Sequence, residues 1–230
     1  RGVDNPALGV RGVRLSLRHP AVFTTQIRAI LRAACYGPMR VLVPMVTQPD
    51  ELIAVRTLFK LARQELKQEG VDLPEKLPLG AMIEVPAAAI NVRTLLEYAD
   101  FLAIGTNDLA QYVLAADRGN DALENVYNPL NPALLRLICH VISAGRRVGK
   151  SVSLCGEIGG DLNFTALLLA LGLCEFSMHP SQLLQVRDRL GELDHGELRR
   201  MAPKLIRAHT HEQVEALLAT LDAAVPVMPA

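Results

Sequence analysis

Short apolar runs alternate with longer amphipathic stretches along most of this chain. The runs cover residues 41–46, 79–85, 101–104, 151–155 and 175–178, and their length and bulk are typical of buried strands. Apolar residues at helical spacing predict helices over residues 21–35, 47–68, 86–98, 108–116, 132–148, 161–171 and 180–190, followed by a pair of charged amphipathic helices between 195 and 221. This alternation predicts an α/β fold with a parallel sheet.

Capping residues and prolines mark several element ends. Thr47 is expected to cap the helix that follows it, which carries Asp50 and Glu51 in its first turn and stops at Gly70. Pro44 cannot donate a hydrogen bond within a sheet, so it indicates a bulge or the end of the first strand.

The number of strand–helix units leaves two architectures open. Five such units cannot close a β/α barrel, which needs about eight. The chain is therefore either an open doubly wound sheet or the later part of a barrel, and the apolar pattern does not choose between them.

Composition narrows the class of protein. Half of the 230 residues are hydrophobic, and 24 basic residues balance 24 acidic ones, so the chain can bury a core and lacks the positive charge of a general nucleic-acid binder. No apolar run approaches the ~20 residues of a membrane helix, and the N-terminal residues do not resemble a signal peptide. The four cysteines have no C-x-x-C spacing, which favours free thiols in a reducing cytoplasm.

Polar side chains follow the predicted strands where each one ends. Glu84 ends the second strand, Asn107 and Asp108 follow the third, Cys155 ends the fourth, and residues 177–179 end the last. In a parallel sheet these ends lie on one edge, so we expect the groups to converge there.

Glu84 and Asp108 are candidate ligands for Mg²⁺ or Mn²⁺, because hard cations of this kind are held by few carboxylates and share their other positions with water and substrate oxygens. Helix capping by each carboxylate is the alternative. Arg118 can clamp a phosphate or a carboxylate on the same ligand, or it can pair on the surface with Asp117 or Asp121.

The sequence leaves a structural role and a chemical role open for Cys155. A lone cysteine after an apolar run is usually a small buried hydrophobe. With Gly156 and Glu157 beside it, an exposed thiol at the site edge becomes a proton donor or a nucleophile. His140 and His179 are interpreted as structural or solvated.

Several ordered motifs resemble one family. I-E-V-P-A-A at 83–88, F-L-A-I-G-T-N-D-L-A-Q-Y at 101–112, A-D-R-G-N-D at 116–121 and L-C-G-E at 154–157 closely resemble the C-terminal domain of Enzyme I of the bacterial phosphoenolpyruvate-dependent sugar phosphotransferase system. N-P-A-L-G-V-R-G-V-R at 5–14 is similar to that family's N-P-F-L-G-W-R segment, with Val10 where a Trp is common. The multi-domain phosphoryl transfer proteins carry the same module.

The resemblance implies a TIM-type β/α barrel that binds phosphoenolpyruvate and Mg²⁺, forms a homodimer, and passes phosphate to a protein histidine and on to a histidine phosphocarrier protein for sugar uptake. It implies that Glu84 and Asp108 are metal ligands and that Asn107, Asp108, Arg118 and Arg11 bind the substrate. Cys155 then matches the acid that protonates the enolate carbon of pyruvate.

The resemblance also implies what the chain lacks. The phosphorylatable histidine domain and the family's Y-R-T-E-F and R-T-x-D-I-G-G-D-K strand ends are absent, so residues 1–230 are expected to be an N-terminally truncated domain with about barrel strands four to eight. We expect this chain alone to bind phosphoenolpyruvate weakly and to transfer no phosphate. Phosphoenolpyruvate synthase, pyruvate phosphate dikinase and a non-catalytic dimerisation module remain the alternatives.

Overall fold

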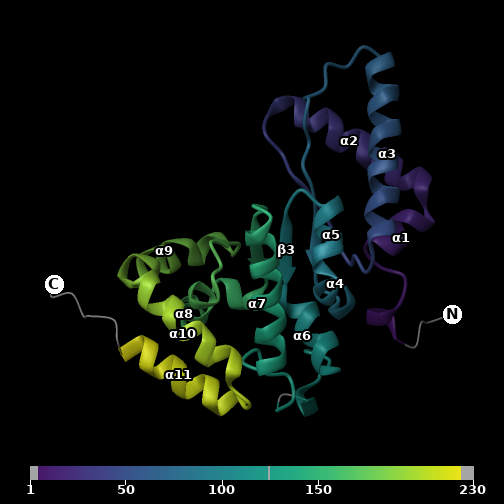
Figure 1. Cartoon of the computed structure of the whole chain (residues 1–230). Helices are drawn as coiled ribbons and strands as arrows, with labels where there is room; N and C mark the ends of the chain where they lie inside the picture. The colour runs from purple at the N-terminus through teal and green to yellow at the C-terminus, as the bar shows by residue number, and fades with distance from the viewer. Residues whose placement is uncertain (1–4, 124, 224–230) are drawn as a thin grey trace.

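The computed structural model describes residues 5–123 and 125–223, and a parallel five-stranded sheet lies at its centre (Figure 1). The strands are β1 (Val41–Val43), β2 (Leu79–Ile83), β3 (Leu102–Gly105), β4 (Val152–Cys155) and β5 (Glu175–Phe176). They follow one another across the sheet in chain order, and every neighbouring pair is parallel.

The helices fill the connections between strands and the C-terminal third of the chain. They are α1 (Val13–Arg18), α2 (Pro20–Ala33), α3 (Pro49–Gln68), α4 (Pro86–Ile90), α5 (Val92–Tyr98), α6 (Thr106–Leu114), α7 (Pro132–Arg147), α8 (Leu162–Leu171), α9 (Leu183–Glu192), α10 (His195–Arg207) and α11 (His211–Ala223). Single 3₁₀ turns lie at Pro6–Leu8, Ala34–Tyr36, Asp121–Leu123, Glu157–Gly159 and Pro180–Gln182.

The strand order decides between the two architectures that the sequence left open. A doubly wound sheet reverses its strand order at a switch point, whereas here each connection moves one strand further in the same direction. Right-handed crossovers that always advance the same way keep all connecting helices on one face, as in a β/α barrel. The fold is therefore part of a TIM-type barrel with additional C-terminal helices, as predicted.

Two boundaries differ from the prediction. β1 ends at Val43, directly before Pro44, so the proline marks a strand end. The cap of α3 is Gln48 rather than Thr47, because the Glu51 carboxylate accepts hydrogen bonds from the backbone N–H groups of both residues and draws the chain into a capping box one position later.

Two helical segments also depart from expectation. The helix predicted over 86–98 is interrupted at Asn91 and becomes α4 and α5. The short α1 was not predicted, because it follows a turn at Gly12, whose φ of 56° no apolar spacing reveals.

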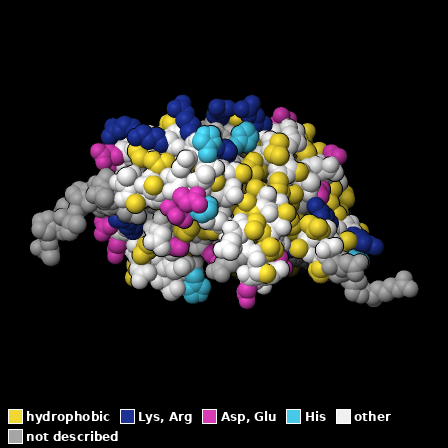
Figure 2. All heavy atoms as spheres, turned by 90° about the horizontal axis from the view of Figure 1, so that it is seen from below, with side chains coloured by type: hydrophobic (Ala, Val, Ile, Leu, Met, Phe, Trp, Pro, Cys, Tyr) yellow, Lys and Arg dark blue, Asp and Glu magenta, His cyan; other side chains and the backbone are white. Residues whose placement is uncertain are grey.

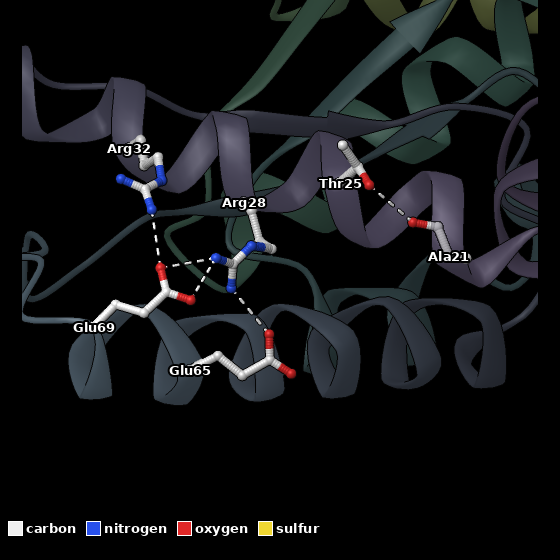
Figure 3. A network of polar contacts seen from close by, with 6 residues as sticks. All are labelled: Ala21, Thr25, Arg28, Arg32, Glu65 and Glu69. Atoms are coloured by element: carbon white, nitrogen blue, oxygen red, sulfur yellow. Dashed lines mark hydrogen bonds and ion pairs between the residues drawn. The ribbon is translucent and has the colours of Figure 1, made fainter.

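The core has a main part around the sheet and a smaller part between α2 and α3. The smaller part packs Ile27 and Leu31 of α2 against Ala62 and Leu66 of α3. On the solvent side of the same two helices, Arg28 and Arg32 of α2 form ion pairs with Glu65 and Glu69 of α3, and Figure 3 draws these side chains as sticks. The ion pairs are exposed, so burial of the apolar side chains supplies most of the stabilisation here.

Across the described ranges, no helix is both long and apolar enough to cross a membrane.

Candidate active site

Four of the predicted site residues, Glu84, Asn107, Asp108 and Cys155, lie where β2, β3 and β4 end at the same edge of the sheet. The strand register pairs Ile83 with Ile104 and Gly105 with Cys155. Glu84 directly follows β2, and Asn107 and Asp108 lie in the first turn of α6, which starts as soon as β3 ends. The backbone therefore brings these groups to one edge, as the sequence predicted.

Glu84 is a buried carboxylate, with only 5% of its surface exposed. Its Oε1 accepts a hydrogen bond of 2.6 Å from the backbone N–H of Met45, a residue just beyond β1 with a φ of 58°. A Cβ on Gly105 would lie 2.9 Å from both Cβ and Oε2 of Glu84. The glycine at the end of β3 thus leaves the space that the Glu84 side chain occupies.

Burial raises the pKa of Glu84, and the negative charge of Asp108 raises it further. The Met45 hydrogen bond and the charge of Arg11 act in the opposite direction. Two carboxyl groups this close repel each other when both are ionised. A divalent cation between them would relieve that repulsion, so the donor set suits Mg²⁺ or Mn²⁺.

The candidate metal site has few protein ligands. Within the described ranges, no group of three or more His, Cys, Asp and Glu side chains is placed to hold a metal ion. A two-carboxylate site of this kind leaves most of the coordination positions of the cation to water or substrate oxygens.

Glu84→Gln is expected to stabilise the metal-free protein at neutral pH. A carboxyl whose pKa is higher in the folded than in the unfolded chain binds its proton more tightly when folded. Its contribution to stability is therefore full below the unfolded pKa of about 4.3 and is lost as the pH rises through the raised folded pKa. The Gln side chain keeps an acceptor for Met45 without the charge.

Thermal unfolding in EDTA measures this effect. The variant should melt at a higher temperature than the parent chain at pH 7 to 8, and the difference should shrink towards pH 4. Glu75→Gln, on the loop before β2, serves as the control and should not alter the pH profile. A variant less stable than the parent at pH 8 would contradict the interpretation of Glu84.

Arg11 reaches the site from the N-terminal segment. Its Nη2 forms an ion pair of 3.1 Å with Oδ2 of Asp108, and its Nη1 donates a hydrogen bond of 3.3 Å to the hydroxyl of Tyr112. The Tyr112 hydroxyl in turn donates to the carbonyl of Ala7. Arg11 is therefore held beside the carboxylate pair, and 39% of its side chain stays exposed to whatever enters the site.

Asn107 lies on the β4 side of the site. Its Nδ2 donates to Oε1 of Glu157 and its Oδ1 accepts from the backbone N–H of Glu157, each at 3.3 Å. The approach depends on Gly156, where a Cβ would lie 2.2 Å from the hydroxyl oxygen of Thr106. Gly156 also has a φ of 116°, so any other residue would be strained at this turn.

Cys155 is half-buried at the end of β4, and its thiol donates to the carbonyl of Ile104 at 3.4 Å. Burial raises the pKa of the thiol, and the nearby negative charge of Glu84 raises it further. The group is therefore protonated at neutral pH. A protonated thiol suits a proton donor, whereas a nucleophile requires the thiolate.

Arg118 is set apart from these residues. It is exposed on the loop after α6, and within the described ranges it forms no ion pair with Asp117, Asp121 or any other carboxylate. Asp117 instead accepts a hydrogen bond from the backbone N–H of Gly119 at 2.9 Å, which closes the turn. The positive charge of Arg118 nevertheless acts on Tyr127, whose pKa is raised chiefly by burial.

Sequence reasoning missed several supporting residues. Met45 binds Glu84 through its backbone, Tyr112 holds Arg11, and Tyr127 donates its hydroxyl proton to the carbonyl of Asn107 at 3.3 Å. Tyr112 lies four residues after Asp108 on α6, so helical spacing offered a signal for it. The other contacts depend on tertiary structure. His179 caps the 3₁₀ turn at Pro180–Gln182, in line with a structural role.

Several known proteins resemble this chain in sequence, and others resemble it in fold. The family model for the PEP-binding domain of PEP-utilising enzymes matches residues 2–195. The phosphoenolpyruvate-protein phosphotransferase of Cupriavidus necator is 43% identical over 220 residues, which cover 94% of this chain and 37% of that protein. The enzyme of the same name from Listeria monocytogenes is 40% identical over 214 residues, covering 93% of this chain and 37% of that protein.

The chain thus spans little more than a third of the length of these relatives. Among solved structures, a citrate lyase from Burkholderia xenovorans matches with a TM-score of 0.56 at 19% identity, covering 90% of this chain and 70% of that one. This last likeness concerns the fold alone.

Proposed function

This chain belongs to the family of phosphoenolpyruvate-utilising enzymes, as their PEP-binding domain, and from that premise we propose that it is the pyruvate-forming part of a phosphoenolpyruvate-protein phosphotransferase. The observation that carries the proposal is the convergence of Glu84, Asp108, Asn107 and Cys155 at one sheet edge. The complete enzyme would move phosphate from phosphoenolpyruvate to a protein histidine and on to a histidine phosphocarrier protein for sugar uptake.

Phosphoenolpyruvate carries negative charge on both its phosphate and its carboxylate. We assign Arg11, Arg118 and Asn107 to binding and orienting these groups, since guanidinium groups bind such oxygens in a bidentate manner and the amide of Asn107 can donate to another. Arg118 is exposed on its loop and forms no carboxylate pair within the described ranges, which leaves its guanidinium available to the ligand.

Glu84 and Asp108 would hold Mg²⁺ or Mn²⁺. The bound ion supplies charge stabilisation to the oxygens of the substrate as negative charge develops on the enolate.

Cys155 is the proposed acid. When the phosphoryl group leaves phosphoenolpyruvate for the accepting histidine, the remaining enolate needs a proton at its methylene carbon to become pyruvate. The Cys155 thiol, kept protonated by burial and by the charge of Glu84, can donate that proton and then recover one from solvent.

The assembly and location of the complete enzyme belong to the same proposal. We expect a homodimer, no nucleic-acid ligand, and a cytoplasmic location. All four cysteines are free thiols, which suits a reducing compartment.

The proposal is tested on a full-length enzyme that carries residues 1–230 as its PEP-binding domain. With labelled phosphoenolpyruvate and Mg²⁺, label should appear on a histidine of the enzyme and then on the phosphocarrier protein, with one pyruvate released per phosphate transferred. A requirement for ATP or pyrophosphate would instead indicate a phosphoenolpyruvate synthase or a pyruvate phosphate dikinase. Dimer formation without any turnover would indicate a non-catalytic module.

A further inference from the structure

A groove on the helical surface runs between α7 and α10, outside the site at the strand ends. It consists of two adjoining hollows of about 260 and 350 Å³, which share Cys139, Ser143 and Ile206 as a common wall. Arg93 of α5 borders the smaller hollow, and the end of α8 at Ala170 and Leu171 borders the larger. We refer to the two hollows together as the arginine groove.

Helical spacing explains why basic side chains gather there. Arg136, Cys139, Ser143 and Arg147 follow one another on α7 at intervals of three or four residues, so they share one face. Arg199, Ala202, Ile206 and Arg207 occupy the facing side of α10. Small or apolar residues of both helices line the hollows together with the longer arginines.

The charge of the groove is of one sign. Its lining contains no aspartate or glutamate, and within the described ranges Arg93, Arg146, Arg147, Arg199 and Arg207 form no ion pair. Figure 2, a view of the molecule from below, shows a row of Lys and Arg side chains with histidines beside it along one edge.

Several arginines outside the groove are paired with carboxylates. Arg28 and Arg32 bind glutamates of α3, and Arg200, the neighbour of Arg199 on α10, pairs with Glu197 at 3.6 Å.

Helix capping explains only part of the cluster. Arg136 donates hydrogen bonds to the carbonyls of Ile206 and Ala208 at the end of α10, at 2.9 and 2.7 Å. Arg146 and Arg147 lie in the last turn of α7, where their positive charges interact favourably with the helix dipole. Neither effect requires the arginines of α5, α7 and α10 to border the same hollows, where their mutual repulsion is unfavourable until an anion is bound.

We propose that the arginine groove binds a small organic anion with two or more phosphate groups, one group over each hollow. Arg93, Arg136 and Arg147 border the smaller hollow, whereas Arg146, Arg199 and Arg207 border the larger. Guanidinium groups match phosphate oxygens in a bidentate manner, and two separate concave positions suit two linked phosphates.

Calorimetric titration of the full chain with inorganic tripolyphosphate tests the proposal. The buffer contains EDTA, so that metal bound at Glu84 and Asp108 plays no part. We expect one saturable site and tighter binding than for inorganic phosphate. Arg146→Gln and Arg147→Gln should each weaken binding at least about tenfold, as the loss of a charge-assisted contact predicts.

Two control variants distinguish binding at the arginine groove from binding at other arginines of the chain. Arg200→Gln changes the adjacent residue of α10 and should leave binding unaltered. Arg118→Gln changes the proposed phosphoenolpyruvate site and should also leave it unaltered, so the groove can succeed or fail independently of the proposed function. Circular dichroism confirms that each variant is folded.

The proposal is overturned if tripolyphosphate shows no saturable binding, if Arg200→Gln weakens binding as much as Arg146→Gln, or if Arg118→Gln alone abolishes it. Saturable binding of a poly-glutamate peptide without binding of tripolyphosphate would likewise overturn it in favour of an acidic protein partner.

Discussion

Replacing Cys155 with alanine should lower the rate of pyruvate formation from phosphoenolpyruvate by about 10²- to 10⁴-fold, the usual contribution of a positioned general acid. Phosphoenolpyruvate binding should change little, because Arg11, Asn107 and the carboxylates remain in place. The assay uses a full-length enzyme carrying residues 1–230, with pyruvate release measured in a single turnover and binding measured by calorimetry.

The pH profile of the parent enzyme adds a readout that a purely structural cysteine would not affect. Burial and the charge of Glu84 raise the pKa of the Cys155 thiol above its ordinary value of about 8.5, so the acid stays protonated through neutral pH. Turnover that depends on it should fall only as the pH rises through that raised pKa. Cys155→Ala should lose this alkaline limb.

Cys174→Ala is the matched control. Cys174 is another free thiol, exposed beyond the end of α8, and its removal should leave both the rate and the pH profile unaltered. Unchanged pyruvate formation in Cys155→Ala would eliminate the thiol as the acid.

Replacing Asp108 with asparagine should weaken Mg²⁺-dependent binding of phosphoenolpyruvate by at least about tenfold, because even outer-shell changes at metal sites cost 10- to 100-fold. The substitution removes one of the two carboxylates proposed as ligands. It also removes the charge that pairs with Arg11 at 3.1 Å, so the guanidinium becomes freer to bind the substrate anion.

A titration with and without metal distinguishes the loss of the metal ligand from the loss of the ion pair with Arg11. With Mg²⁺ present, Asp108→Asn should bind phosphoenolpyruvate more weakly than the parent, whereas in EDTA, where only the loss of the ion pair with Arg11 matters, the variant should bind at least as tightly as the parent. Asp117→Asn, on the loop after α6, supplies the control and should retain the full effect of the metal. Equal stimulation by Mg²⁺ in the parent chain and Asp108→Asn would remove Asp108 from the metal site.

Local patterns predicted most of the elements. Apolar runs located all five strands, and helical spacing located α2, α3 and α6 to α11, because burial of one face requires those patterns whatever the surrounding fold. The shift of a cap from Thr47 to Gln48 arises from hydrogen bonds to Glu51, and the break between α4 and α5 arises from the backbone conformation of Asn91. Apolar patterns are insensitive to both. The short α1 depends on the conformation of Gly12 and on a hydrogen bond from Val13 to the carbonyl of Pro44, a contact between segments distant in the chain.

Within the site, the sequence placed Glu84, Asp108, Asn107 and Cys155 at strand ends, and parallel pairing of β2, β3 and β4 brings them together. It did not reveal that Arg11 would pair with Asp108, or that Arg118 would lie exposed and without an ion pair to any described carboxylate. The reason is that a loop or an N-terminal segment has no periodicity that fixes its direction, and only packing decides where its side chains lie.

By itself, then, the sequence determined the alternation of strands and helices, the order of the polar strand ends and the motifs of a PEP-binding domain, because each is local in the chain. Tertiary structure alone decided that the sheet advances without reversal, as a barrel does, and that Gly105 and Gly156 leave room for the Glu84 and Asn107 side chains. It also decided that burial keeps the Cys155 thiol protonated. Strand order, close approach and desolvation depend on residues far apart in sequence, so they emerge only when the chain is folded.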